Sequence, residues 1–108
     1  AAELERAGFD RDNIILDPGF GFAKSVEQNY ALLAGLSKLV ATGYAVLVGL
    51  SRKSMIYKVL NTTAEDSLAG TIALSWEALR QGATILRVHD VYQAVQIAKI
   101  YDKGFRNL

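Results

Sequence analysis

The sequence predicts an α/β protein made of three consecutive strand–helix units. Short apolar runs rich in β-branched residues alternate with longer segments whose apolar residues recur at the helical period. Glycines, a proline and polar loops separate these segments. Such alternation is typical of parallel strands joined by right-handed crossovers. The pattern fits a doubly wound sheet or part of a (β/α)8 barrel, and a complete barrel needs about 250 residues against the 108 present.

In the first unit, a strand is predicted over residues 13–16 and a helix after it. The strand is broken by Asp17-Pro18-Gly19, because proline removes a backbone donor and glycine favours a turn. Ser25 is expected to begin the helix, with Gln28 in position to complete a capping box. Apolar residues continue at helical spacing, which predicts one helix with a stop at Gly43.

The second unit begins with a predicted strand over residues 45–50, AVLVGL. Its residues are apolar at both alternating positions, which suits a parallel strand covered on both faces. A polar loop at 51–54 and a short apolar segment at 55–60 follow. Thr63, with an acidic residue three positions later, is expected to cap a helix that runs to about Gln81.

The third unit is predicted to contain a strand over residues 84–88 and the last helix. Asp90 is the expected N-cap, with Gln93 behind it, and the helix should run to Lys103 before Gly104 ends it. No linker or low-complexity segment divides the chain. All three units are therefore expected to belong to a single domain.

Composition excludes several classes of function. The net charge of +1 gives no reason to expect a nucleic-acid or membrane partner through bulk electrostatics, and no apolar run approaches the roughly 20 residues of a membrane helix. The absence of cysteine excludes disulfides, thiolate nucleophiles and Cys-based zinc sites, and it fits a cytoplasmic protein. One histidine cannot build a His-rich metal site, so no metal ligands are predicted.

Polar residues follow each predicted strand where it ends. They are Asp17, then the Ser51–Ser54 loop, then Arg87 and His89. Because ligands bind at the carboxyl ends of parallel strands, we expect a carboxylate, three cations and an imidazole to converge there. A carboxylate can accept two N–H bonds from a heterocycle edge, whereas Lys and Arg can hold phosphates or a carboxylate. The set predicts a ligand with an anionic part and a planar hydrogen-bonding part.

Each of these residues also has a purely structural interpretation. Asp17 could be only a turn residue, and Arg52 and Lys53 could belong to a solvated loop. Arg87 could form a structural ion pair, and His89 could be a core or capping histidine. Their shared position at one sheet edge favours the functional interpretation, because residues with unrelated structural roles would rarely all lie at the same edge. The glycine-rich loop after the first strand matches neither a dinucleotide fingerprint nor a P-loop.

Three motifs carry a resemblance to a known family. LDPGFGFAKSVEQN, VGLSRKSMI and RVHDV resemble, in order and separation, the last three strand ends of dihydropteroate synthases. The match covers nearly the whole chain, and three motifs in register are highly specific. Two departures are small: Ala23 stands where many members have glycine, and Tyr57 stands where the family usually has glycine.

The resemblance implies a fold and a reaction. The fold would be three consecutive βα units from the C-terminal part of a (β/α)8 TIM barrel, incomplete as an isolated chain, with residues 1–108 forming a single partial domain. The family joins 6-hydroxymethyl-7,8-dihydropterin pyrophosphate to p-aminobenzoate, releasing pyrophosphate, in folate biosynthesis, and it is the target of sulfonamides. It requires Mg²⁺, whose protein ligand is expected in the N-terminal part of the barrel.

The resemblance also implies roles for individual residues. Lys53, Arg87 and His89 would be the catalytic residues: Lys53 would contact the pterin and help to form the p-aminobenzoate site, Arg87 would lie over the pterin and reach the pyrophosphate, and His89 would bind the departing phosphates. Asp17 would bind the amino-pyrimidine edge of the pterin. The remaining substrate-binding residues would line the p-aminobenzoate site, and they are Gly21, Phe22 and Ser54.

The resemblance sets limits as well. Further active-site groups come from the N-terminal strands of the family, so we expect the chain alone to be inactive. A homodimer through the last helices is implied. The alternatives are a fragment of a folate-binding methyltransferase, a non-catalytic assembly module derived from a pterin-binding barrel, and a small flavodoxin-like domain unrelated to folate.

Overall fold

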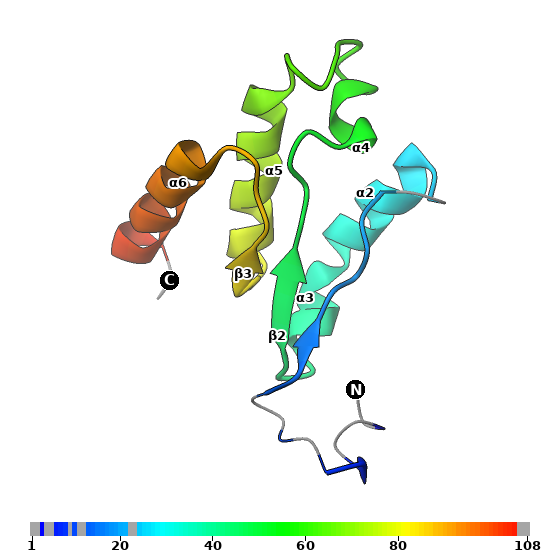
Figure 1. Cartoon of the computed structure of the whole chain (residues 1–108), viewed down its shortest axis with the longest axis vertical. Coiled ribbons are helices and arrows are strands. Elements are labelled where there is room, and N and C mark those ends of the chain that lie inside the picture. The colour runs from blue at the N-terminus through cyan, green and yellow to red at the C-terminus, as the bar shows by residue number, and fades with distance from the viewer. Residues whose placement is uncertain (1–2, 4–5, 9, 11–12, 22–23, 106–108) are drawn as a thin grey trace.

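Three parallel strands form the sheet of the computed structural model, which describes residues 3, 6–8, 10, 13–21 and 24–105. The strands are β1 (Ile15–Leu16), β2 (Ala45–Val48) and β3 (Ile85–Leu86), in the order β1-β2-β3. Ile15 pairs with Ala45, and Leu47 pairs with Ile85. The predicted α/β class, strand order and parallel direction are confirmed, although each strand is shorter than the apolar run that predicts it (Figure 1).

The helices α2, α3 and α5 lie on the same side of this sheet, and α6 lies outside α5 (Figure 1). On α5, the ring of Trp76 meets Tyr101 of α6 edge to face, with 5.4 Å between centroids. No helix among the described residues is both long and apolar enough to cross a membrane. The helices are α2 (Val26–Ala34), α3 (Leu36–Val40), α4 (Ser54–Tyr57), α5 (Leu68–Arg80) and α6 (Val91–Gly104).

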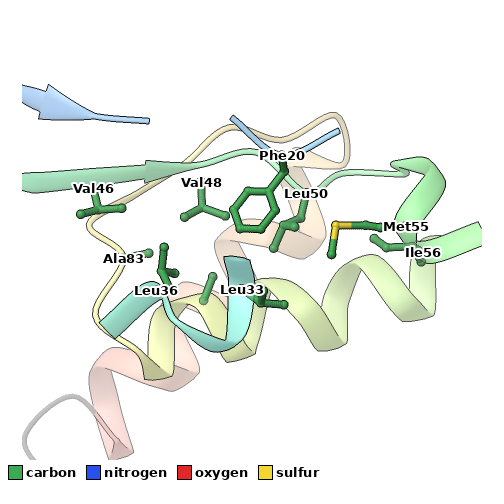
Figure 2. Packing of buried hydrophobic residues seen from close by; sticks show 10 residues of the cluster. Phe20, Leu33, Leu36, Val46, Val48, Leu50, Met55, Ile56 and Ala83 are labelled. Atoms are coloured by element: carbon green, nitrogen blue, oxygen red, sulfur yellow. The ribbon is translucent and has the colours of Figure 1, made fainter. Parts of the chain in front are cut away.

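The hydrophobic core lies between the sheet and its helices (Figure 2). Val46 and Val48 of β2 are fully buried against α2, α3 and α5. Because side chains alternate along a strand, the intervening positions face the other side of the sheet, which no helix of the described chain covers. Ile15 on that side is 52% exposed. The sequence predicts that β2 is covered on both faces, whereas the helices of the described residues cover one; the other face is the one that a (β/α)8 barrel turns inward.

The predicted capping box of the first helix is confirmed. The Ser25 hydroxyl accepts a hydrogen bond from the Gln28 backbone N–H at 3.1 Å, and the Gln28 side chain accepts one from the Ser25 N–H at 2.8 Å. Two of the first orphan donors of the helix are thereby satisfied.

The prediction of one continuous helix after Ser25 is wrong, because the chain breaks at Gly35 into α2 and α3. The Gln81 side chain, at the end of α5, fills the break. It donates to the Leu33 carbonyl at 2.6 Å and accepts from the Ser37 N–H at 2.9 Å. A side chain inserted into the helical ladder in this way satisfies the backbone groups that the break releases.

The helix α5 begins at Leu68, so the prediction that Thr63 caps it is also wrong. Residues 58–67 form turns instead. The carbonyl oxygens of Ala64 and Glu65 accept hydrogen bonds from the Arg52 guanidinium at 2.8 and 2.6 Å. These contacts help to hold residues 64 and 65 in the turns that precede α5.

Candidate active site

A cavity of about 430 Å³ lies at the carboxyl ends of β2 and β3. All three residues with predicted catalytic roles, Lys53, Arg87 and His89, line it together. Their convergence is the arrangement that parallel strand topology predicts. The remaining lining residues are Gly49, Ser51 and Val88.

Hydrogen bonds hold the loops after β2 and β3 side by side. The Arg87 N–H donates to the Val48 carbonyl at 2.9 Å, which extends the strand pairing by one residue. The His89 N–H donates to the Ser51 hydroxyl at 3.2 Å. These two bonds place Arg87 and His89 next to the polar loop that carries Lys53, although the residues lie more than 30 positions apart in the sequence.

Arg87 lies over a glycine that the sequence analysis did not single out. A Cβ built on Gly49 would stand 3.2 Å from both Nε and Nη2 of Arg87. Among the residues that the structure describes, the Arg87 guanidinium makes no hydrogen bond and no ion pair. It is exposed and remains available to an anion. The glycine within the apolar run AVLVGL, two residues before the polar loop, was the available signal.

Lys53 connects the second loop to the first. Its ammonium donates to the Phe20 carbonyl at 3.0 Å, and its side chain crosses Gly21, where a Cβ would stand 3.3 Å from Nζ. Gly21 has φ of +99°, a conformation that residues with a side chain rarely adopt. The structure shows that the missing side chain of Gly21 leaves room for Lys53; its place in the p-aminobenzoate site stays a prediction.

Asn29 holds Gly21 in place through a buried hydrogen bond, and the sequence did not predict this role. Only 1% of Asn29 is exposed. Its Oδ1 accepts from the Gly21 N–H at 2.9 Å, and its Nδ2 donates to the Ser25 carbonyl at 3.1 Å. A polar residue between Val26 and Leu33 on the apolar stripe of α2 was the signal that could have revealed it.

Three residues with predicted binding roles lie elsewhere or outside the described structure. Asp17 is exposed and does not line the cavity; its Oδ1 accepts from the Gly19 N–H at 2.9 Å, as a turn aspartate does. Ser54 is the first residue of α4 and does not line the cavity either. Phe22 lies outside the described residues. The binding roles of all three stay predictions.

Arg52 is not among the cations that line the cavity, although it lies between Ser51 and Lys53, which do. Its guanidinium forms a bidentate ion pair with Asp90, with Nε–Oδ2 at 3.0 Å and Nη2–Oδ1 at 2.9 Å. The Arg52 hydrogen bonds hold the pKa of the Asp90 carboxyl below its usual range. Asp90 is the N-cap of α6, as predicted, but its side chain makes no capping bond because Arg52 occupies it.

The electrostatics of the cavity favour an anion. Its lining contains a lysine, an arginine and a histidine and no carboxylate, since Asp90 is engaged by Arg52. Within the described ranges, no group of three or more His, Cys, Asp or Glu side chains is placed to hold a metal ion. Cations in a recess at the ends of parallel strands are the arrangement that holds phosphate groups.

Comparison with known proteins identifies the family. A profile described as pterin binding enzyme matches residues 1–89. The chain belongs to the pterin-binding enzyme family. Its relatives include the dihydropteroate synthase of Escherichia coli K12, which is 43% identical over 101 residues, covering 94% of this chain and 36% of the relative. The dihydropteroate synthase of Streptococcus pyogenes serotype M6 is 52% identical over 87 residues, covering 79% and 33%.

Solved structures of family members agree with the fold. A Yersinia pestis dihydropteroate synthase with a sulfonamide drug matches with a TM-score of 0.90 and 39% identity, covering 99% of this chain and 39% of that one. A Coxiella burnetii enzyme in complex with pteroic acid matches with a TM-score of 0.88 and 44% identity, covering 95% and 39%. The chain therefore corresponds to three βα units of a (β/α)8 barrel, and it spans about 36% of the length of its E. coli relative.

Proposed function

We propose that the chain supplies part of the active site of a dihydropteroate synthase, which condenses 6-hydroxymethyl-7,8-dihydropterin pyrophosphate with p-aminobenzoate to give 7,8-dihydropteroate and pyrophosphate. The observation that carries this proposal is the cavity lined by Lys53, Arg87 and His89. A cationic recess suits the pyrophosphate, and the surrounding sequence is 43% identical to an enzyme of this name.

In the proposed reaction, the bond between the pterin methylene carbon and the pyrophosphate oxygen breaks first. The amine nitrogen of p-aminobenzoate then forms the new bond and loses a proton. Arg87 and His89 stabilise the charge that develops on the leaving group, because both face the cavity from the loop after β3. Asp17 stabilises the cationic pterin.

Lys53 holds geometry and does not accept a proton in this scheme. Its ammonium already donates to the Phe20 carbonyl at 3.0 Å, so it fixes the first loop beside the cavity. Lys53 also contacts the pterin and helps to form the p-aminobenzoate site, which Ser54, Gly21 and Phe22 line. The benzoate ring packs on Phe22.

The proposed enzyme uses Mg²⁺, and the residues of this cavity do not fit that ion. Magnesium prefers carboxylate, water and phosphate oxygens, whereas the cavity offers cations and no carboxylate. The protein ligand of the metal is proposed to lie in barrel strands outside this chain. The same strands complete the pterin pocket, so the chain by itself is expected to be inactive.

The outer surface of α6 supports a homodimer. Its exposed side chains include Tyr92 at 73%, Val95 at 45% and Ile100 at 59%, which lie on one side of the helix at 3.6 residues per turn. A second copy of the chain that packs against this helix would remove these groups from water. The same surface favours the alternative function, a non-catalytic assembly module. The proposed location is the cytoplasm, which a chain without cysteine fits.

The test is product formation with dihydropterin pyrophosphate, p-aminobenzoate and magnesium. The purified chain is assayed alone and after mixing with a separately expressed N-terminal part of the E. coli relative. Product only on mixing, lost in a Lys53→Met variant of this chain, is the expected result. No product in either case, from a chain shown to be folded by circular dichroism, would remove the enzyme proposal in favour of the assembly module.

A further inference from the structure

We propose that Arg52 and Asp90 form a clamp that positions Lys53 and His89 for anion binding without either clamp residue touching the substrate. The inference rests on the proposed function, since it concerns the pyrophosphate part of that site. Arg52 directly precedes Lys53, and Asp90 directly follows His89. The clamp therefore joins the two loops at the residues that flank the cavity lining, and both members are positioning residues.

The guanidinium of Arg52 is occupied by contacts within the protein. Nε and Nη2 bind the two oxygens of Asp90, and Nη1 donates to the carbonyls of Ala64 and Glu65. These bonds use four of the five N–H donors of the side chain. Arg52 thus draws three segments together: the loop after β2, the turns before α5, and the start of α6. Little donor capacity is left for a ligand.

The backbone at Arg52 supports the same interpretation. Its φ is +53°, in the left-handed region that costs a residue with a side chain roughly 1–2 kcal/mol. Such a conformation persists only where the surroundings determine it. Here the Arg52 N–H donates to the Thr71 hydroxyl at 3.0 Å, and that hydroxyl donates to the Ser67 carbonyl at 2.9 Å. The loop is therefore held from both its backbone and its side chain.

The clamp and the anion site also share a direct link. Ser51, one residue before Arg52, accepts from the His89 N–H at 3.2 Å and lines the cavity. The ion pair and this bond together fix the separation between the loop of Lys53 and the loop of His89. Loss of the ion pair leaves the Ser51 bond, together with the backbone bond from Arg87 to Val48 at the strand ends, to hold that separation. A misplacement of about 1 Å at a binding group costs roughly 100-fold in function, so the clamp has a measurable effect.

A competing role for Arg52, as a direct phosphate ligand, gives the opposite result for one variant. Replacing Asp90 with asparagine would free the guanidinium, so a direct ligand would bind anions as well as before or better. If Arg52 only positions the loop, the Asp90→Asn variant would bind anions less well, because the loop of Lys53 loses its attachment to Asp90. Asp90→Asn therefore separates the two roles.

The experiment measures the binding of inorganic pyrophosphate to the isotopically labelled chain by NMR. His89 is the chain's one histidine, so its imidazole gives an assignable signal that reports on the cavity directly. The variants are Arg52→Lys, Arg52→Ala, Arg52→Gly and Asp90→Asn. Arg80→Lys is the matched control, because Arg80 forms the same kind of bidentate pair with Glu77 on the outside of α5.

The expected result is binding by the wild type and the Arg80 control, with pyrophosphate affinity lowered roughly 10-fold or more in all four clamp variants. Lysine at position 52 should not restore pyrophosphate affinity, because it lacks the planar guanidinium that binds a carboxylate and two carbonyls together. Thermal unfolding, compared with affinity, separates positioning from a general loss of stability. Arg52→Gly relieves the positive φ and should unfold at a higher temperature than Arg52→Ala, yet bind pyrophosphate equally weakly.

Other outcomes show whether the proposed function or only the clamp is wrong. A wild type that leaves the His89 signal unchanged in pyrophosphate would refute the anion site, and the proposed function and the clamp with it. A wild type that binds while Arg52→Lys and Asp90→Asn bind equally well would overturn the clamp alone. Tighter binding by Asp90→Asn that disappears when Arg52 is also changed to alanine would make Arg52 a ligand, since removal of the Asp90 charge alone also favours an anion. Affinities that follow the unfolding temperatures of the glycine and alanine variants would reduce the clamp to a stability element.

Discussion

The guanidinium of Arg87 rests on Gly49, with Nε and Nη2 both 3.2 Å from the place where a Cβ would stand. The two residues directly follow the neighbouring strands β2 and β3, and both line the cavity. A side chain at position 49 would lift the guanidinium by a few tenths of an ångström. The orientation of the Arg87 guanidinium thus depends on the absence of one methyl group.

Gly49→Ala should weaken anion binding without destabilising the fold. The φ of Gly49 is not in the left-handed region, so alanine fits the backbone and should change the free energy of unfolding by about 0.4–1 kcal/mol in the stabilising direction. The displaced Arg87 should lower pyrophosphate affinity severalfold, measured by titration. Gly35→Ala, where a Cβ meets only ordinary contacts far from the cavity, is the control and should bind normally. Unchanged affinity in Gly49→Ala would show that Arg87 does not depend on this contact.

Asn29→Ala should destabilise the chain by about 1–3 kcal/mol, because it leaves the buried N–H of Gly21 without its acceptor. Urea denaturation measures the loss. Gln28→Ala, on the exposed side of the same helix, removes one bond of the capping box and should cost less. A smaller loss for Asn29→Ala than for Gln28→Ala would contradict the assignment of Asn29 as the support of the first loop.

The parts of this structure that could be predicted depend on local spacing and on topology. The capping box of Ser25 and Gln28 is a pattern of four residues, and it forms as predicted. The meeting of Lys53, Arg87 and His89 follows from the parallel order of the strands alone. Neither prediction needs the conformation of a distant side chain.

The parts that could not be predicted depend on side-chain pairs that are distant in sequence. The break at Gly35 is filled by Gln81, whose contacts with Ser37 and Leu33 span 44 and 48 residues. Arg52 turns away from the cavity towards Asp90, 38 residues later. Helical periodicity carries no information on such pairs, so a continuous helix and a third cation at the site were the natural predictions.

Acid should destabilise the chain partly through Asp90. The hydrogen bonds from Arg52 lower the folded pKa of Asp90 below its ordinary value of 3.8. This contribution to stability is fully present above the unfolded pKa and is lost as the pH falls through the lower, folded pKa. Asp90→Asn should therefore show a weaker loss of stability on acidification, measured by urea midpoints from about pH 6 down to about pH 2.

The second acidic residue with a lowered pKa serves as the comparison for Asp90. The pKa of Glu77, on the outside of α5, is lowered by its hydrogen bonds with Arg80. Glu77→Gln should also flatten the acid limb of the stability profile, but it should leave pyrophosphate binding intact. An acid limb in Asp90→Asn as steep as that of the wild type would contradict the Arg52–Asp90 linkage.

Gly70 is expected to be the least replaceable glycine of the helices. A Cβ at this position in α5 would overlap Cγ2 of Ile56 and press on Leu60 at 3.1 Å. Ile56 is 2% exposed, and its Cγ2 can move only by rotation about χ1, which a buried β-branched residue in a helix strongly resists. Gly70→Ala should therefore cost about 1–3 kcal/mol as α4 is pushed off α5, even though alanine is the better helix former.

The double variant Gly70→Ala/Ile56→Leu tests that cause. Leucine lacks the Cγ2 methyl and keeps the volume of isoleucine, so it should recover part of the stability that Gly70→Ala loses. Ile56→Leu alone should be mildly destabilising, which makes the pair non-additive, as expected of side chains in contact. Urea denaturation of the four proteins measures the coupling. Additive losses would mean that the cost at position 70 arises elsewhere than at the contact between α4 and α5.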